Sequence, residues 1–194
     1  METIVKGTGA LLVEDGKERL LVISDLHLSS GEDTYSIIKR LKKLIIETKP
    51  NSLIILGDMF NLGGGADEVD RFDLEISKIL LVNIVCGNHD VEIFPKMVVS
   101  NNYCFLHGDK DYSSGEKKTL ILGHTHPMLK GKRVFLKGVL KDGRGFILMP
   151  VFNELVGGPE LSDKSYLLGF IFSQELIKHC DVYDLSGKKL GKLL

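Results

Sequence analysis

The chain has 194 residues, the length of one domain with a sizeable hydrophobic core, and we expect a single domain over residues 1–194. Its 43% apolar and 26% charged residues, with 25 basic against 26 acidic side chains, exclude a disordered, collagen-like or coiled-coil protein. No apolar run approaches the roughly 18 residues of a membrane span, and residues 1–9 lack a signal-peptide pattern, so we expect a cytoplasmic protein without membrane contact.

The first half of the chain alternates short apolar runs, typical of buried strands, with longer runs of helical periodicity. We predict strands at residues 10–13, 20–23, 53–56 and 81–85, and helices with apolar faces over residues 37–45 and 69–80. Asp33 or Thr34 can cap the first helix, and Pro50 prevents its continuation. This alternation implies parallel strands whose sheet is covered by helices on both faces.

The second half of the chain is poorer in helical periodicity. Strands are predicted at residues 103–106 and 119–122 and, after Pro127, at 133–140, 145–149, 167–172 and 181–185. Glycine-containing turns separate the later strands. We therefore expect a second, mostly antiparallel sheet that packs on the first.

Side chains that can bind metal follow five of the predicted strands. The segments are Asp25-Leu26-His27, Gly57-Asp58, Gly87-Asn88-His89-Asp90, His107-Gly108-Asp109 and Gly123-His124-Thr125-His126. Five of the six histidines of the chain lie in these segments. Because the carboxyl ends of parallel strands meet at one edge of a sheet, we expect these side chains to lie together.

The donor types predict the kind of metal centre. Imidazole, carboxylate and carboxamide groups without thiolates suit borderline divalent ions such as Mn²⁺, Fe²⁺, Co²⁺ or Zn²⁺. Seven such groups are too many for one ion. Two ions about 3.5–4 Å apart with a shared carboxylate would use them all, and that arrangement is typical of phosphoester hydrolysis.

The ordered motifs DxH, GD, GNHD, H and GHxH resemble the signature of the calcineurin-like metallophosphoesterases over Asp25 to His126. The resemblance implies an α/β fold, a four-layer α-β-β-α sandwich of two mixed sheets with flanking helices. It implies that one ion is bound by Asp25, His27 and His126, the other by Asn88, His107 and His124, and both by Asp58. His89 is then the histidine that contacts the phosphate and protonates the leaving group.

One position departs from the family pattern. Many members have Asp or His three residues after the bridging carboxylate, where this chain has Asn61. Asn61 can orient His89 by a hydrogen bond, but it cannot stabilise an imidazolium by charge. The alternative is that Asn61 only begins the glycine-rich loop that follows it.

The resemblance implies a dinuclear metal-dependent phosphoester hydrolase that attacks with a metal-bridged hydroxide, with Mn²⁺ favoured and Fe²⁺, Co²⁺, Ni²⁺ or Zn²⁺ as alternatives. The GNHD motif and residues 150–158 are similar to the small phosphoesterases related to the catalytic subunit of the SbcCD repair nuclease. We therefore expect a phosphodiesterase that acts on nucleic-acid or nucleotide-like substrates. A phosphomonoesterase and a metal-binding scaffold without catalysis are the alternatives, and no protein partner is predicted.

The charges divide unevenly along the chain. Residues 1–97 carry 11 basic and 16 acidic side chains, whereas residues 98–194 carry 14 and 10. The densest basic stretch consists of Lys130, Lys132, Arg133, Lys137, Lys141 and Arg144. It could contact a phosphate backbone, or it could keep a strand edge solvated and discourage aggregation.

Overall fold

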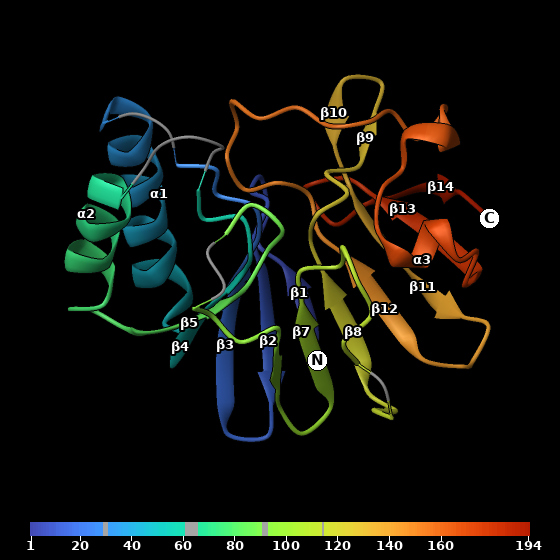
Figure 1. The fold of residues 1–194 in the computed structure, drawn as a ribbon, viewed down its shortest axis with the longest axis horizontal. Helices are drawn as coiled ribbons and strands as arrows, with labels where there is room; N and C mark the ends of the chain where they lie inside the picture. Colours follow the sequence, from blue (N-terminus) through green and yellow to red (C-terminus); the bar gives the residue numbers. More distant parts are fainter. Residues whose placement is uncertain (29–30, 61–65, 91–92, 114) are drawn as a thin grey trace.

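Two β-sheets pack face to face in the computed structural model of the chain, which describes residues 1–28, 31–60, 66–90, 93–113 and 115–194 (Figure 1). The first sheet has five strands in the order β1-β2-β3-β4-β5. They are β1 (Glu2–Ile4), β2 (Leu11–Asp15), β3 (Glu18–Ile23), β4 (Ser52–Leu56) and β5 (Leu81–Val85). The strands β3, β4 and β5 are parallel, as the alternation predicts, whereas β1 and β2 pair antiparallel at one edge.

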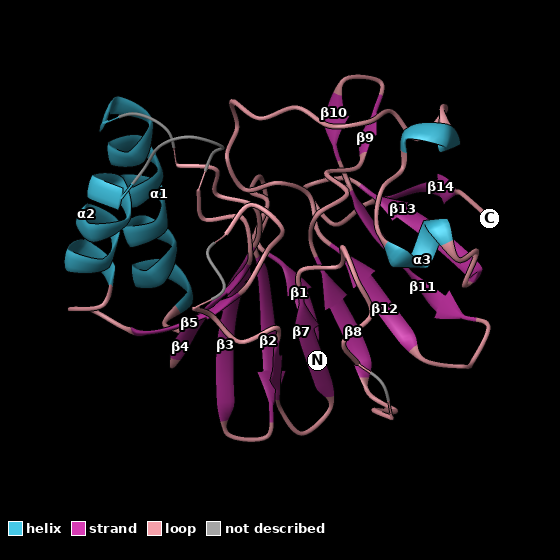
Figure 2. Ribbon diagram, viewed as in Figure 1, coloured by secondary structure: helices cyan, strands magenta, loops and turns pink. Residues whose placement is uncertain are grey.

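Two helices connect the parallel strands and cover the same face of the first sheet (Figure 2). The helix α1 (Gly31–Thr48) ends where Lys49 takes a left-handed φ of 46° ahead of Pro50. The prediction that Asp33 or Thr34 caps α1 is wrong, because the helix already begins at Gly31. The helix α2 (Ala66–Ile76) is shorter than predicted, and Leu80 packs on the core from the turn behind it. No described helix has both the length and the apolar character that crossing a membrane requires.

The second sheet has seven strands in the order β14-β13-β11-β12-β8-β7-β6. They are β6 (Met97–Val99), β7 (Tyr103–Leu106), β8 (Thr119–Leu122), β11 (Phe135–Leu140), β12 (Gly145–Leu148), β13 (Ile177–Tyr183) and β14 (Lys189–Lys192). The pairs of β8 with β7 and β12 are parallel and the others are antiparallel. A separate hairpin, β9 (Met128–Leu129) and β10 (Lys132–Arg133), follows β8.

The predicted strand at residues 167–172 is wrong. This segment contains the short helix α3 (Phe170–Ser173), which follows Gly169 at a φ of 97° and the 3₁₀ turn η1 (Lys164–Tyr166). A short apolar run fits a strand or a buried helical turn equally well. Here Leu167, Phe170 and Ile171 pack on the outer face of the second sheet.

Three buried apolar clusters correspond to the three interfaces of a four-layer sandwich. One lies between the helices and the first sheet, one between the two sheets, and one outside the second sheet. The fold class is therefore confirmed, with an outer layer on the second sheet that includes the short helix α3 and the 3₁₀ turn η1. The expectation of helices on both faces of the first sheet is wrong, because its other face packs on the second sheet.

Candidate metal centre

All the side chains with predicted metal-binding roles come from loops at the carboxyl ends of strands. Asp25 and His27 follow β3, Asp58 follows β4, and Asn88 and His89 follow β5; His107 follows β7, while His124 and His126 follow β8. The loops are bonded to one another, since the His27 N–H donates to the carbonyl of Asp58 at 2.8 Å and the Gly123 N–H to that of His107 at 2.8 Å. Both sheets thus contribute to one site.

Five of the seven predicted ligands have left-handed backbone conformations. Their φ angles are 56° for Asp25, 44° for His27, 49° for Asp58, 68° for His124 and 48° for His126. Such conformations cost about 1–3 kcal/mol each and persist only where the surrounding structure holds them. They cluster here because each ligand leaves its strand through a tight turn that directs the side chain to a common point.

Two motif positions require glycine because side chains of the site lie directly against their backbone. A Cβ atom at Gly87 would lie 2.1 Å from Oδ1 of Asp58, and one at Gly57 would lie 2.6 Å from Nδ1 of His107. Any side chain at either position would occupy the space of a predicted ligand. These glycines therefore accompany the ligands for a steric reason.

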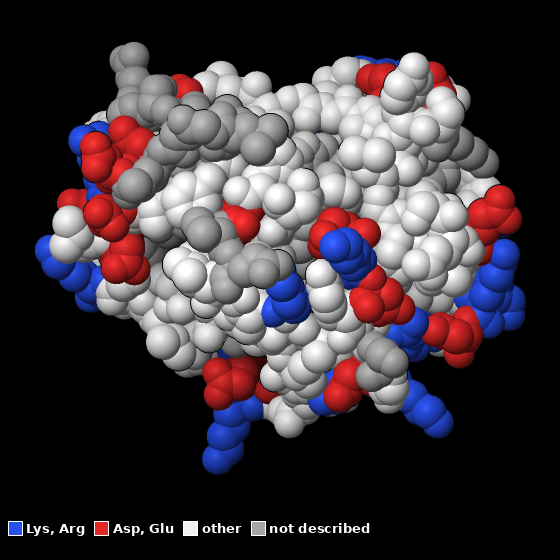
Figure 3. Space-filling view, in the orientation of Figure 1, with Lys and Arg blue, Asp and Glu red and all other residues white. Residues whose placement is uncertain are grey.

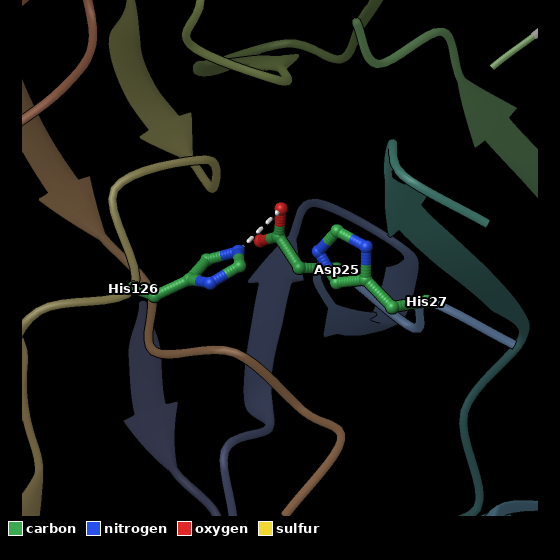
Figure 4. Close-up of side chains that lie close together, drawn as sticks. All are labelled: Asp25, His27 and His126. Carbon is green, nitrogen blue, oxygen red and sulfur yellow. Dashed lines mark ion pairs between the residues drawn. The ribbon is translucent and has the colours of Figure 1, made fainter. Parts of the chain in front are cut away.

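The first group of predicted ligands consists of Asp25, His27 and His126, whose donor atoms lie within 4.8 Å of one another (Figure 4). Asp25 is fully buried, and its Oδ1 lies 3.1 Å from Nε2 of His126. Nε2 of His27 is also buried, and it has no hydrogen-bond partner among the described residues. An unpartnered buried nitrogen costs free energy unless another group, such as an ion, satisfies it.

The second group consists of Asp58, His107 and His124. His107 is buried, and its Nε2 lies 3.0 Å from Oδ1 of Asn88 and 3.0 Å from Nδ1 of His124. The structure therefore brings Asn88 together with this group, as the motif analysis anticipates.

The hydrogen bonds of two histidines direct their lone pairs into the site. Nδ1 of His107 donates to the carbonyl of Leu56 at 2.8 Å, and Nδ1 of His126 donates to that of Gly157 at 3.2 Å. In the neutral rings, each Nε2 is then an acceptor that faces another acceptor, Oδ1 of Asn88 or Oδ1 of Asp25. A cation between the facing acceptors resolves this conflict. Donation of the outer nitrogen to a carbonyl is also the usual arrangement of metal-binding histidines, so the residues fit divalent ions.

The charges in the site favour the ligating forms of most donors. Burial lowers the pKa of His27, and burial together with His107 lowers the pKa of His124 to about 4. Burial opposes ionisation of Asp25, but His126 outweighs it and the pKa of Asp25 lies below its ordinary value. The carboxylate of Asp25 in turn raises the pKa of His126 against the effect of burial, and burial raises the pKa of Asp58. Near pH 7, His27 and His124 are neutral and Asp25 is charged.

His89 lies at the rim of the two groups. Its backbone N–H donates to Oδ1 of Asp58 at 3.0 Å, and its ring packs edge-to-face on His27 with centroids 5.5 Å apart. The side chain is 26% exposed, whereas those of Asp58 and His107 are almost completely buried. Asn61 lies outside the described residues, so its orientation of His89 stays a prediction.

Two further contacts were not assigned a role from the sequence. Asp90, the last residue of GNHD, accepts hydrogen bonds from the N–H groups of Met59 and Gly87, both at 2.8 Å, and joins the two loops that flank Asp58. The carbonyl of Gly157 orients His126 from a distant part of the chain. The only sequence signals were the motif position of Asp90 and the glycine pair at 157–158.

The chain belongs to the calcineurin-like phosphoesterase family, whose sequence model matches residues 18–142. That span includes every predicted site residue, and membership makes the chain a metal-dependent phosphoester hydrolase.

Solved structures of two proteins align with this chain, and the first of them shares its fold. A nuclease, MPE, from Pseudomonas putida aligns with a TM-score of 0.57 and 20% identity over 78% of this chain and 89% of its own. YfcE, a phosphoesterase from E. coli, aligns with a TM-score of 0.49 and 17% identity over 89% of this chain and 97% of its own. Comparison with curated proteins finds no match.

Proposed function

We propose that the chain is a two-ion phosphodiesterase that hydrolyses nucleic-acid or nucleotide-like phosphodiesters. The observation that carries this proposal is the position of Asp58, whose Oδ2 lies 3.8 Å from Nε2 of His27 and 3.5 Å from Nε2 of His107. Because His27 belongs to the first group and His107 to the second, one carboxylate adjoins both. Such a carboxylate suits a pair of ions that share a ligand.

Each ligand has a proposed place. Asp25, His27 and His126 would hold the first ion, Asn88, His107 and His124 the second, and Asp58 both. The mixture of imidazole, carboxylate and carboxamide donors favours Mn²⁺, with Fe²⁺, Co²⁺, Ni²⁺ and Zn²⁺ as alternatives.

The proposed chemistry divides between the ions and the chain. When bound, the ions would supply hydroxide near neutral pH and neutralise charge on the phosphate oxygens. The bond between phosphorus and the leaving oxygen then breaks, and that oxygen needs a proton. His89 is the proposed donor, because it lies beside Asp58, has a partly exposed side chain and is not among the proposed ligands. Asn61 is proposed to orient it.

The choice of a diester rests on further support. The Pseudomonas putida neighbour is a nuclease, residues 150–158 are similar to the repair-nuclease branch, and the exposed Lys130 and Lys132 lie on the β9–β10 hairpin that begins just after His126. A phosphodiester carries less negative charge than a phosphomonoester, but the same cations can promote attack on either. The proposed ligands therefore do not separate diester from monoester substrates, and the following assay does.

The test compares substrates on one preparation. Protein reconstituted with Mn²⁺ is assayed on bis-p-nitrophenyl phosphate, p-nitrophenyl phosphate, single-stranded DNA and 2′,3′-cyclic nucleotides, with Asp58→Asn as the control for contaminating activity. We expect kcat/KM to be at least about tenfold higher for the diester than for the monoester. The reverse order would make the chain a phosphomonoesterase, and inactivity with every metal would favour the scaffold alternative.

A further inference from the structure

The segment of residues 150–158, here called the strap, runs along the loop that carries Asp25 and His27. The hydroxyl of Ser24 donates to the carbonyl of Pro150 at 3.1 Å, and the N–H of Phe152 donates back to the carbonyl of Ser24 at 2.9 Å. In Figure 1 the strap is the orange segment that crosses from the second sheet toward α1. It therefore joins elements that are far apart in sequence.

The contact of Asn153 falls between two predicted ligands. Its side-chain amide donates to the carbonyl of Leu26 at 2.9 Å, and its Oδ1 accepts the N–H of Leu155 at 3.0 Å. Asn153 is only 3% exposed. Because Asp25 and His27 on either side of Leu26 are both left-handed, the bond to Leu26 restrains the backbone between two strained residues.

The far end of the strap reaches the third ligand of the first group. The carbonyl of Gly157 accepts the hydrogen bond from His126, and a Cβ atom at Gly158 would lie 1.9 Å from the carbonyl oxygen of His126. In the described part of the chain, no hydrogen bond joins the strap to Asp58, His107 or His124. Among the described residues, the hydrogen bonds between the strap and the ligand loops therefore go to the loops of the first group.

Two arginines from different elements hold the strap in place. Arg40 of α1 and Arg133 of β10 both donate to the carbonyl of Phe152, at 2.6 and 3.1 Å, and each lies 3.0 Å from Oε1 of Glu154. The guanidinium of Arg40 also lies 4.3 Å above the Phe152 ring. These contacts attach the middle of the strap to α1 and to the β9–β10 hairpin.

We propose that the strap is a positioning element that sets the affinity of the first group for its ion, with Asn153 as its main positioning residue. This inference rests on the proposed two-ion centre. Groups that orient metal ligands from outside typically change affinity by about 10–100-fold when removed. Loss of Asn153 should therefore weaken the binding of one of the two ions and leave the binding of the other unchanged.

The full chain and its Asn153→Ala variant are titrated with Mn²⁺ by calorimetry and followed by electron paramagnetic resonance. We expect wild type to bind two ions with the spectrum of a coupled pair. The variant should bind one ion about 10–100-fold more weakly, while its affinity for the other ion changes by less than a factor of about three. At intermediate Mn²⁺ concentrations, the variant should show the spectrum of uncoupled ions. Asn51→Ala is the matched control, because Asn51 accepts the N–H of Arg19 ahead of β4, at the end away from the ligands, and should not alter either affinity.

A measurement on metal-free protein separates this inference from the two-ion proposal. Amide exchange at Asp25 and His27, whose N–H groups donate to the Gly57 and Asp58 carbonyls, should be at least about tenfold faster in Asn153→Ala, while exchange at Gly123 is unchanged. Unchanged exchange at Asp25 and His27, or equal weakening of both ions, overturns the strap proposal. If the wild-type chain binds only one ion, the two-ion proposal is overturned instead. The amide exchange at Asp25 and His27 then still decides the role of the strap.

A second variant keeps the proposal testable if Asn153→Ala does not fold. Glu154→Gln keeps the size of a side chain that is 53% exposed while removing the charge between the two arginines. If Asn153→Ala does not fold, Glu154→Gln should still weaken the same single ion, by a smaller factor. Wild-type affinity for both ions in Glu154→Gln would then overturn the proposal.

Discussion

At the residue scale, backbone strain is concentrated in the proposed metal ligands. The left-handed conformations of Asp25, His27, Asp58, His124 and His126 are each unfavourable for a residue with a side chain, yet they bring the donor atoms to common points. The loops hold one another by backbone hydrogen bonds, and these bonds restrain the strained backbone at the donor residues.

His89 provides the sharpest residue-scale prediction. His89→Ala should retain both ions, because the imidazole is not a proposed ligand, and should lose about 10²–10⁴-fold in kcat on substrates with poor leaving groups. The loss should shrink for p-nitrophenyl esters, whose leaving oxygen hardly needs a proton. A series of aryl phosphodiesters with increasing leaving-group pKa measures this dependence. An equal loss across the series would assign His89 to phosphate binding.

The identities of the predicted ligands follow from the sequence, but their environment does not. Residue type, order and position after predicted strands were enough to indicate which groups meet. The left-handed residues Asp25 and His27 donate to carbonyls about 30 residues away, and the partner of His126 is the backbone carbonyl of Gly157, 31 residues away, whose role the glycine pair at 157–158 does not specify. Asn61 lies outside the described residues, and its role stays a prediction.

At the element scale, the buried strands were predictable, whereas three of the edge strands were not. The strands β3, β4, β7 and β8 are almost wholly buried and read as apolar runs. The edge strands β1, β6 and β14 are three or four residues long and partly exposed, so their patterns are indistinct. The antiparallel addition of β1 and β2 depends on pairing between segments, which local periodicity does not encode.

Asp15 at the end of β2 ties the two sheets together. Its carboxylate is 1% exposed and accepts the backbone N–H of Asn102 at 3.0 Å and the side-chain amide of Asn102 at 2.5 Å, just ahead of β7. We predict that Asp15→Ala lowers the free energy of unfolding by about 1–3 kcal/mol at pH 7, measured by urea denaturation. Asn51→Ala, an exposed change, should have a smaller effect.

The stabilisation by Asp15 should also depend on pH. Burial alone would raise the pKa of Asp15, but the polar groups of Ser100 and Asn102 outweigh burial and lower it. A carboxyl whose pKa is lower in the folded chain stabilises the fold above its ordinary pKa of about 4 and loses this effect as the pH falls. The stabilities of wild type and Asp15→Ala should therefore converge below pH 4. A constant difference down to pH 2 would contradict the assignment.

At the scale of the whole molecule, the basic stretch of residues 130–144 does not form one surface. Arg133 bonds the strap, Lys137 lies 3.0 Å from Glu2 on β1, and Arg144 pairs with Asp142 at 2.7 Å. Basic and acidic side chains are interspersed on the face shown in Figure 3. These pairings leave Lys130 and Lys132, on the hairpin next to the centre, as the basic residues best placed for nucleic acid.

Replacement of these two lysines tests a nucleic-acid substrate. We predict that Lys130→Ala with Lys132→Ala weakens binding to duplex DNA at low ionic strength, for all sequences alike. The salt dependence should fall by up to about 0.9 log units per lost phosphate contact. Turnover of bis-p-nitrophenyl phosphate should not change. The double change Lys188→Ala with Lys192→Ala, on exposed residues near the C-terminus, is the control, and an equal effect there would show only general charge attraction.

The central claim is that this site holds two ions that share Asp58. Anomalous diffraction from crystals soaked in Mn²⁺ tests it most directly. We predict two peaks about 3.5–4 Å apart on either side of the Asp58 carboxylate, one against Asp25, His27 and His126 and the other against Asn88, His107 and His124. A single peak at saturating Mn²⁺, or two peaks that Asp58 does not join, would contradict the claim.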